Sequence, residues 1–270
     1  MRRRSDLASR AHGTTAGQLE LGRLRGNCAH GEGEALVHVG PGQLAGPART
    51  LPAAGGTSAA FWVGIGGFGV RSPSLQQLGV SADCAPGSGA PRDLAWTEIV
   101  PAPAIYAHFT VRPGDLITAT VEMQGRRVTL AMRNVTRKTR FARTFVVKHT
   151  LDTSSAEWIA EAPSLCRTSA SCTVLPLTNF GTVRFSGATA TAGGHSGAIA
   201  DPAWLTTPLA LVTSNGFADY VDSNPAGALP RPLSAARNAF AVGYRPRLSV
   251  AQSPVPASPL EGAPLPPWYH

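Results

Sequence analysis

The chain has 270 residues, of which 15% are charged, with 29 glycines, 23 prolines and a net charge of +8. Few charges and many glycines and prolines argue against long amphipathic helices and favour short strands joined by turns. No run approaches the roughly 18 apolar residues that a membrane-spanning helix needs, so we expect no membrane partner.

The N-terminal segment, residues 1–55, shows no strand pattern and is predicted to be irregular. Its start, MRRRSDLASRAHGTTAGQ, has the basic residues of a secretion signal but no apolar core after them, so we expect no export signal in the chain as it stands. Residues 56–250 are predicted to form one domain, and the Pro-rich residues 251–270 an extended tail.

Short β-prone runs, each followed by Gly, Pro or Asp, succeed one another from residue 59. The clearest hairpin is DLITATVEMQGRRVTLAMRN, in which two alternating runs meet at Gln124-Gly125. Runs at this spacing, almost without helical periodicity, predict an all-β fold, an antiparallel sandwich of two packed sheets. The predicted strands are 59–65, 74–80, 94–100, 105–111, 116–123, 126–133, 140–148, 156–161, 182–191, 208–213 and 238–244.

The first predicted strand runs into a G-x-G-x-x-G spacing at Gly64, Gly66 and Gly69. A dinucleotide site needs a helix directly after such a loop, because the helix N-terminus holds the pyrophosphate. Here Pro73 disfavours helix at Ser72, so we do not expect a nucleotide site.

A basic segment covers the next hairpin, with no acidic residue between Glu122 and Asp152. The alternation of RRVTLAMRNVT favours a solvated sheet face over a nucleic-acid site, and no aromatic residues interleave with the arginines as stacking platforms. Phe141 and Phe145 are expected to face inward, and no nucleic-acid partner is expected. The basic residues are Arg126, Arg127, Arg133, Arg137, Lys138, Arg140, Arg143 and Lys148.

Four cysteines are present, Cys28, Cys84, Cys166 and Cys172. Cys166 and Cys172 flank a loop, CRTSASC, that is compatible with a small disulfide loop in an exported protein. Their spacing does not fit a zinc knuckle and no histidine pair has ligand spacing, so we expect no metal.

Three acids stand in apolar strand contexts, Glu98, Glu157 and Glu161. Glu157 precedes Trp158, and partial desolvation there would raise its pKa and suit it to general acid–base work. The alternative is an edge-strand acid that faces water.

Seven segments follow in one order over residues 59–191: FWVGIGG, SLQQLGV, LAWTEIVP, RPGDLITATVE, NVT, SSAEWIAE and LTNFGTVRF. This ordered series resembles the glutamic peptidases (eqolisins), acid-active secreted endopeptidases with a concanavalin-like β-sandwich. The resemblance implies an extracellular enzyme without a cofactor, a monomer that acts on protein or peptide substrates.

Matched by position, the resemblance implies that Gln77 and Glu157 are the catalytic pair. Glu157 would take a proton from the attacking water, and Gln77 would donate to the developing oxyanion. Period-two alternation puts Gln76 and Gln77 on opposite faces, so that one of them reaches the site. Glu98 would lie near the pair, and Trp62 and Trp96 would line the substrate cleft.

Two departures from the family pattern bear on activity. The family has Asp where this chain has Gly66, which removes a carboxylate expected to support the pair. Two N-terminal family segments are also missing. Read one base out of frame with permitted codons, residues 18–25 become NWSWVGYV and residues 36–48 become SFTSVQGSWPVPP. We therefore hypothesise that the first 50 residues or so are a frame-shifted reading of a glutamic peptidase gene. The alternative function is a catalytically impaired β-sandwich that binds peptide or glycan.

Overall fold

The computed structural model describes residues 12–19, 56–68, 72–85, 92–168, 171–211 and 226–248, with the backbone alone for 12–19, 164–168 and 171–173. Its described residues contain strands and turns but no helix, and so no helix that could cross a membrane. The strands are β1 (His12–Leu19), β2 (Thr57–Gly66), β3 (Leu75–Cys84), β4 (Arg92–Ile99), β5 (Ile105–Tyr106), β6 (Ile117–Gln124), β7 (Arg127–Asn134), β8 (Thr139–Val146), β9 (Ala156–Glu161), β10 (Ser164–Thr168), β11 (Ser171–Val174), β12 (Thr182–Ala192), β13 (His195–Ala198), β14 (Gly227–Pro230) and β15 (Phe240–Arg245).

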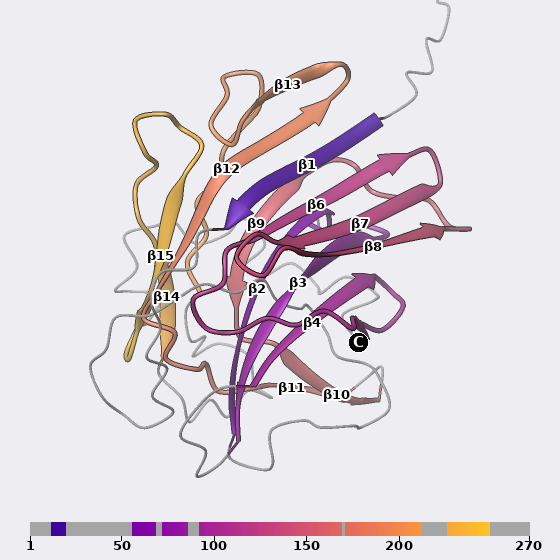
Figure 1. Ribbon diagram of the computed structural model, residues 1–270. Helices are drawn as coiled ribbons and strands as arrows, with labels where there is room; N and C mark the ends of the chain where they lie inside the picture. The colour runs from indigo at the N-terminus through magenta and orange to yellow at the C-terminus, as the bar shows by residue number, and fades with distance from the viewer. Residues whose placement is uncertain are drawn as a thin grey trace, which may run out of the picture.

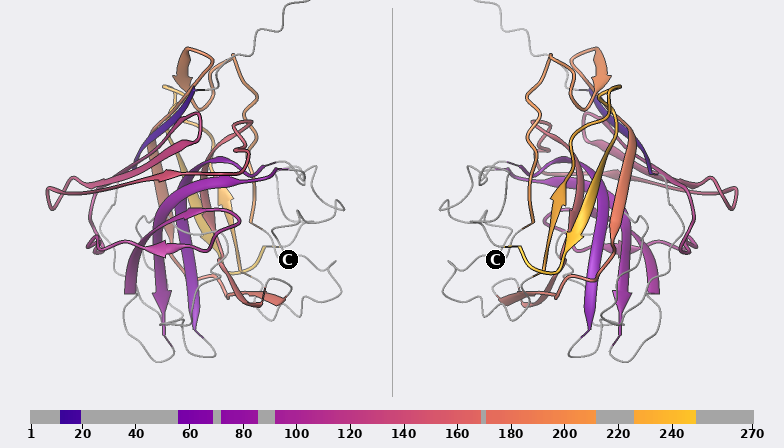
Figure 2. Two further views of the ribbon diagram at one scale, coloured as in Figure 1. Left: turned by 90° about the vertical axis from the view of Figure 1, so that its right-hand side faces the viewer. Right: turned by 90° about the vertical axis from the view of Figure 1, so that its left-hand side faces the viewer.

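Two antiparallel sheets face each other (Figures 1 and 2). The large sheet has the order β14-β15-β12-β1-β6-β7-β8, with β13 paired to β12, and the small sheet has the order β5-β4-β3-β2-β9. Strands β10 and β11 form a separate hairpin. The predicted all-β sandwich is thus confirmed.

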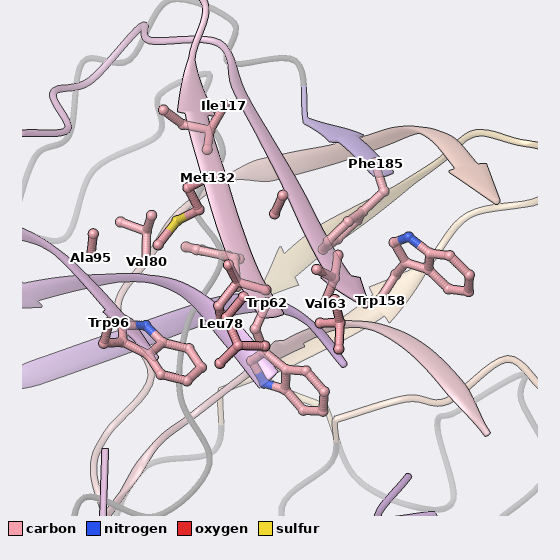
Figure 3. Close-up of a cluster of buried hydrophobic side chains, with 14 of the residues drawn as sticks. Trp62, Val63, Leu78, Val80, Ala95, Trp96, Ile117, Met132, Trp158 and Phe185 are labelled. Carbon is pink, nitrogen blue, oxygen red and sulfur yellow. The ribbon is translucent and has the colours of Figure 1, made fainter. Parts of the chain in front are cut away.

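The core lies between the two sheets, because their facing strands present apolar side chains at every second position. Strand β6 buries Ile117, Ala119, Val121 and Met123, and its partner β7 follows the same period. Figure 3 shows Met132 and Ile117 of the large sheet in one cluster with Val63, Leu78 and Val80 of the small sheet. The remaining labelled members of this cluster are Ala95, Trp96, Trp62, Trp158 and Phe185.

Strands β2 and β3 are buried on both faces, unlike the half-buried strands of the large sheet. Phe61 and Val63 point to the large sheet, while Trp62 and Gly64 alternate with them and lie on the opposite side of the small sheet. We call this opposite side, defined by Trp62, Gly64, Gln77 and Glu157, the outer face of the small sheet. It carries the candidate site.

The predicted hairpin is present, with Gln124 opposite Arg127 in the ladder. Gly125 has φ +61°, as the first central residue of a tight hairpin turn requires. The basic side chains are exposed around this hairpin and β8, the edge strand of the large sheet. Phe141 and Phe145 pack inward, as expected, and Arg143 lies 4.9 Å over the Phe145 ring.

Several elements differ from the prediction. Strand β1 lies within residues 1–55, which were expected to be irregular, and it pairs with both β6 and β12. The CRTSASC loop is a hairpin, in which Cys166 is opposite Cys172. The strand predicted at 105–111 is reduced to Ile105–Tyr106. Of 208–213, the described residues contribute only an isolated bridge at Leu211, and residues 212–213 lie outside the described part.

Gly66 ends β2 with φ +80°, and the chain turns there instead of entering a helix. The expected absence of a nucleotide loop therefore stays a prediction, with Gly69 outside the described residues. Residues 251–270 also lie outside them, so the predicted tail is not described.

Candidate active site

One row of residues crosses four strands of the small sheet. Gly64 on β2 pairs in register with Gln77 on β3 and with Glu157 on β9, and Gln77 pairs in turn with Glu98 on β4. Residues opposite each other in an antiparallel ladder point to the same face. Three of the predicted site residues are therefore brought together on the outer face. Gly64 itself adds no side chain between Gln77 and Glu157, and the Trp62 and Leu75 side chains lie over it.

A second row lies one step along the strands. Trp62 and Trp96 both pair with Gly79, so their indoles share the outer face with only a glycine between them. In Figure 3 both rings lie in the lower part of the view, below Met132 and Ile117. The indole nitrogen of Trp96 is buried without a hydrogen-bond partner, whereas the indole of Trp62 is directed to Glu161. The two tryptophans predicted to line the site thus border the row that holds Gln77 and Glu157.

Gln77 is fully buried and its amide is oriented by Glu98. Gln77 Nε2 donates to Glu98 Oε2 at 2.5 Å, while Gln77 Oε1 has no partner. Burial raises the pKa of Glu98 well above its ordinary value, against the opposing bond from Gln77. The charge of Glu161 raises it further. A buried amide with one end unbound can still accept or donate to a further group on this face.

The neighbouring Gln76 has a different environment, as alternation predicts. With its amide turned to satisfy both ends, Nε2 donates to the carbonyls of Ile65 and Asp152, and Oε1 accepts from Ser74 Oγ at 2.6 Å. All of these partners are on the chain itself. Gln76 is therefore a structural residue that holds the end of β2 to the segment before β9.

Glu157 lies half-buried on β9, the edge strand of the small sheet. Burial raises the pKa of Glu157 to about 8, although the Ser155 hydroxyl donates to Oε1 at 2.9 Å and opposes the rise. The expected partial desolvation of Glu157 agrees with its half-buried position on this edge strand. Its predicted partner in desolvation, Trp158, alternates to the core side and packs there.

Glu161 lies four residues further along β9, on the same face as Glu157, and pairs with Ala60. Burial raises its pKa well above the ordinary value, opposed by the indole of Trp62 and reinforced by Glu157. Glu161 Oε1 has no hydrogen-bond partner. The outer face therefore gathers three carboxyl groups with raised pKa values, those of the buried Glu98 and of the half-buried Glu157 and Glu161, which favour their neutral forms.

Sequence reasoning missed two features of the site. The first is Gly64, the residue that pairs in register with both Gln77 and Glu157. The nucleotide-like glycine spacing hid this role. Ser155 stands two residues before Glu157 and so shares its face, a period-two signal that could have identified it. Among the described residues, no group of three or more His, Cys, Asp or Glu side chains is arranged to hold a metal ion.

The model of the peptidase A4 family matches residues 39–215 of the chain. The chain belongs to the peptidase A4 family. No curated protein matches the sequence. The resemblance to glutamic peptidases noted in the sequence is thus confirmed, and the chain is a hydrolase of this family.

Two solved structures of glutamic peptidases are similar to this A4 family chain. Aspergilloglutamic peptidase from Aspergillus niger is 25% identical, with a TM-score of 0.53 over 70% of this chain and 99% of that chain. Scytalido-glutamic peptidase, solved with a peptide-based transition-state analogue, is 17% identical, with a TM-score of 0.57 over 88% of this chain and 99% of that chain. The second likeness supports the fold alone.

Proposed function

We propose that this A4 family chain is an acid-active endopeptidase in which Glu157 and Gln77 are the catalytic pair. The observation that carries the proposal is the single row in which Gln77 and Glu157 flank Gly64. A substrate carbonyl that displaced the Trp62 and Leu75 side chains from above Gly64 would have a carboxyl group on one side and an amide donor on the other. Glu157 would take a proton from the attacking water, and the Gln77 amide would donate a hydrogen bond to the oxyanion that forms on the carbonyl oxygen.

The amide donor is prepared by its neighbours. Glu98 accepts one N–H of the Gln77 amide, which leaves the second N–H for an oxyanion. An amide fixed by a buried partner needs little reorganisation when charge develops. Loss of one such donor costs about 10²–10³ in kcat, so we expect Glu98 to act on the reaction through Gln77.

The proton state of Glu157 sets a condition on the mechanism. Burial raises the pKa of Glu157 to about 8, so its carboxyl group is neutral in acid. A general base must be ionised, and desolvation is the main cause of the raised pKa. We infer that water must reach Glu157 before the reaction, because hydration of the carboxylate lowers its pKa toward the ordinary value.

The pH profile of kcat/KM tests this condition, since it reports the pKa values of the free enzyme. We expect a bell-shaped profile centred in the acid range. A profile that instead rises toward pH 8 would mean that Glu157 reacts with its raised pKa of about 8, and it would contradict acid activity.

The assignment of the pair is tested by cleavage of a denatured protein substrate at acid pH. Glu157→Gln should abolish cleavage, whereas the matched control Glu122→Gln, on the large sheet, should retain it. Equal cleavage by wild type and Glu157→Gln would reject Glu157 as the base.

The binding-module alternative is favoured by one observation, the complete burial of Gln77 and its engagement by Glu98. It predicts a wild-type protein that retains peptides without cleaving them at any pH. We further propose, from the family, that the enzyme is extracellular and monomeric. Secretion assays and light scattering would test these two points.

A further inference from the structure

Asp152 is bound to the turn between β2 and β3 through its side chain and its backbone. Its Oδ2 accepts hydrogen bonds from Ser72 Oγ and, at 3.2 Å, from the backbone N–H of Gly67. Its Oδ1 accepts from the N–H of Ser154 at 2.8 Å. The N–H of Asp152 donates to Ser74 Oγ at 2.8 Å. One residue thus fastens the segment before β9 to the end of β2.

The place that Asp152 occupies exists because position 66 is a glycine. A Cβ on Gly66 would lie 2.7 Å from the carbonyl oxygen of Asp152, 2.9 Å from its Cβ and 2.8 Å from the carbonyl oxygen of Ser74. Gly66 also has φ +80°, which side-chain-bearing residues rarely adopt. A carboxylate therefore stands beside Gly66 although the residue itself contributes none. The support expected to be missing at Gly66 has a counterpart in Asp152.

The fastened segment leads directly to Glu157. The N–H of Gly66 donates to the carbonyl of Ser155 at 3.0 Å, and the Ser155 hydroxyl donates to Glu157 Oε1 at 2.9 Å. Between Asp152 and Ser155 the turn is closed by the bond from Ser154 to Asp152. The position of the Ser155 hydroxyl on Glu157 thus depends on contacts that Asp152 makes.

We propose that Asp152 is a positioning residue of the active site, which holds the Ser155 hydroxyl on Glu157 and keeps a negative charge close to that carboxyl group. This inference rests on the proposed function, because it assigns Asp152 to the setting of the base. Asp152 does not touch the reacting atoms and acts through Ser155 and through its charge.

The charges around Glu157 support the proposal. Burial alone would raise the pKa of Asp152, but the bonds from Ser72, Ser154 and Gly67 outweigh it and hold the pKa below its ordinary value. Asp152 therefore stays ionised to lower pH than an ordinary aspartate. Its charge raises the pKa of Glu157, after burial and against the Ser155 bond.

The other groups that face Glu157 are acids or amides. Glu161 follows on β9 and interacts with Glu157, and it interacts in turn with Glu98 on β4. Gln77 on β3 shares the row of Glu157, and β2 contributes Gly64 and the indole of Trp62 but no titratable side chain. Among the described residues, no basic side chain shifts the pKa of Glu157. An added or removed charge at Asp152 is therefore not masked by a nearby basic side chain.

The experiment compares two substitutions with opposite expected effects on Glu157. Asp152→Asn keeps Oδ1 as the acceptor for the Ser154 N–H and removes the like charge, so it should lower the pKa of Glu157 by about half a pH unit or more. Ser155→Ala removes the donor to the carboxylate and should raise that pKa. Both are read as shifts of the acid limb of kcat/KM against pH. Ser72→Ala keeps the charge and should shift the limb by less than half as much as Asp152→Asn.

A second readout does not need activity. The Glu157 carboxyl carbon, labelled with ¹³C and assigned by its loss in Glu157→Gln, can be titrated by NMR in each variant. If the wild type does not cleave, the proposed catalytic function fails, while the titration still tests Asp152. Opposite shifts for Asp152→Asn and Ser155→Ala support the inference. Unmoved titration in Asp152→Asn, or lower stability as its only effect, overturns it. If Asp152→Asn does not fold, an unchanged titration in Ser155→Ala overturns it.

Discussion

Gln77 and Glu157 are each paired in register with the same residue, Gly64, one from β3 and one from β9. The two side chains therefore emerge on one face, two strand spacings apart, or roughly 10 Å between their backbones. The Trp62 and Leu75 side chains lie over the glycine between them, so a peptide group must displace these side chains to reach both residues. The relationship depends on three strands and on the absence of a side chain at Gly64.

The two adjacent glutamines should respond differently to truncation. Gln77→Ala should lower kcat by about 10²–10³ and should cost less stability than loss of Gln76, because Glu98 is the one partner that it strands. Gln76→Ala should instead destabilise the fold by about 1–3 kcal/mol, because it strands the buried polar groups that Gln76 binds. Steady-state kinetics and urea unfolding of both variants separate the two effects. Equal kinetic losses would contradict the assignment of Gln77.

A methyl group at Gly64 should collide with the side chains that lie over this position. An added Cβ would lie 2.9 Å from Trp62 Cζ3 and 3.1 Å from Leu75 Cδ1. Gly64→Ala should therefore cost about 1–3 kcal/mol of stability through overpacking, and most of the activity of the folded fraction. Gly243→Ala on β15 is the matched control, since its nearest neighbour would be the Arg245 side chain at 3.5 Å. Full activity in Gly64→Ala would argue against a substrate group above this position.

The fold should be most stable in acid. The pKa values of Glu98, Glu157 and Glu161 are raised in the folded state, mainly by burial. The folded chain therefore binds more protons than the unfolded chain above the ordinary glutamate pKa. The stabilisation that these three groups provide is fully present below that pKa. It is lost as pH rises toward their pKa values in the folded state, about 8 for Glu157.

Urea midpoints at pH 4 and pH 7 measure this dependence. Each pKa unit of difference corresponds to about 1.4 kcal/mol for one group. Glu161→Gln should flatten the curve, because the amide has no charged form to desolvate. A midpoint that rises between pH 4 and pH 7 would contradict the burial of these acids.

The Asn-Val-Thr triplet at Asn134 should stay unmodified when the protein is made in a glycosylating host. Such triplets are glycosylation acceptors in secreted proteins. Here Asn134 is fully buried, and its Nδ2 donates to Asp115 Oδ2 at 2.7 Å and to the Thr110 carbonyl at 3.2 Å. Intact-mass measurement before and after glycosidase treatment should give the same value. A glycan on Asn134 would mean that this end of the hairpin does not fold as described.

The nucleotide sequence across codons 15–56 tests the frame-shift hypothesis. We expect the frame shifted by one base to encode NWSWVGYV and SFTSVQGSWPVPP in that order. Codons that forbid this reading would make the N-terminal sequence genuine. Expression of the corrected frame, if present, would then be compared with the present chain in the same cleavage assay.

The sandwich was predictable because alternation is strong in the strands that build it. The hairpin of β6 and β7 has apolar residues at every second position from Ile117 to Met132. Strand β1, HGTTAGQL, has no such alternation, and it is a strand because β6 and β12 pair with it on either side. The sequence of β1 alone contains no signal for those partners.

The sequence led to the two residues proposed as the catalytic pair, but not to the residues that hold them in place. Motif order led to Gln77 and Glu157, and alternation correctly separated Gln76 from Gln77. The contact between Gly66 and Asp152 joins positions more than 80 residues apart in the chain, and no local pattern links them. Contacts of this kind depend on the register of the assembled sheet.

The close contact of Gly66 with Asp152 has an evolutionary consequence. An aspartate restored at Gly66 would collide with backbone atoms of Asp152 and Ser74, so the two positions cannot change independently. A relative with an acid at the position of Gly66 must place the backbone around position 152 differently. A protein with acids at both positions would be destabilised. Among related sequences, the residues at these two positions should therefore vary together, with an acid at one or the other and seldom at both.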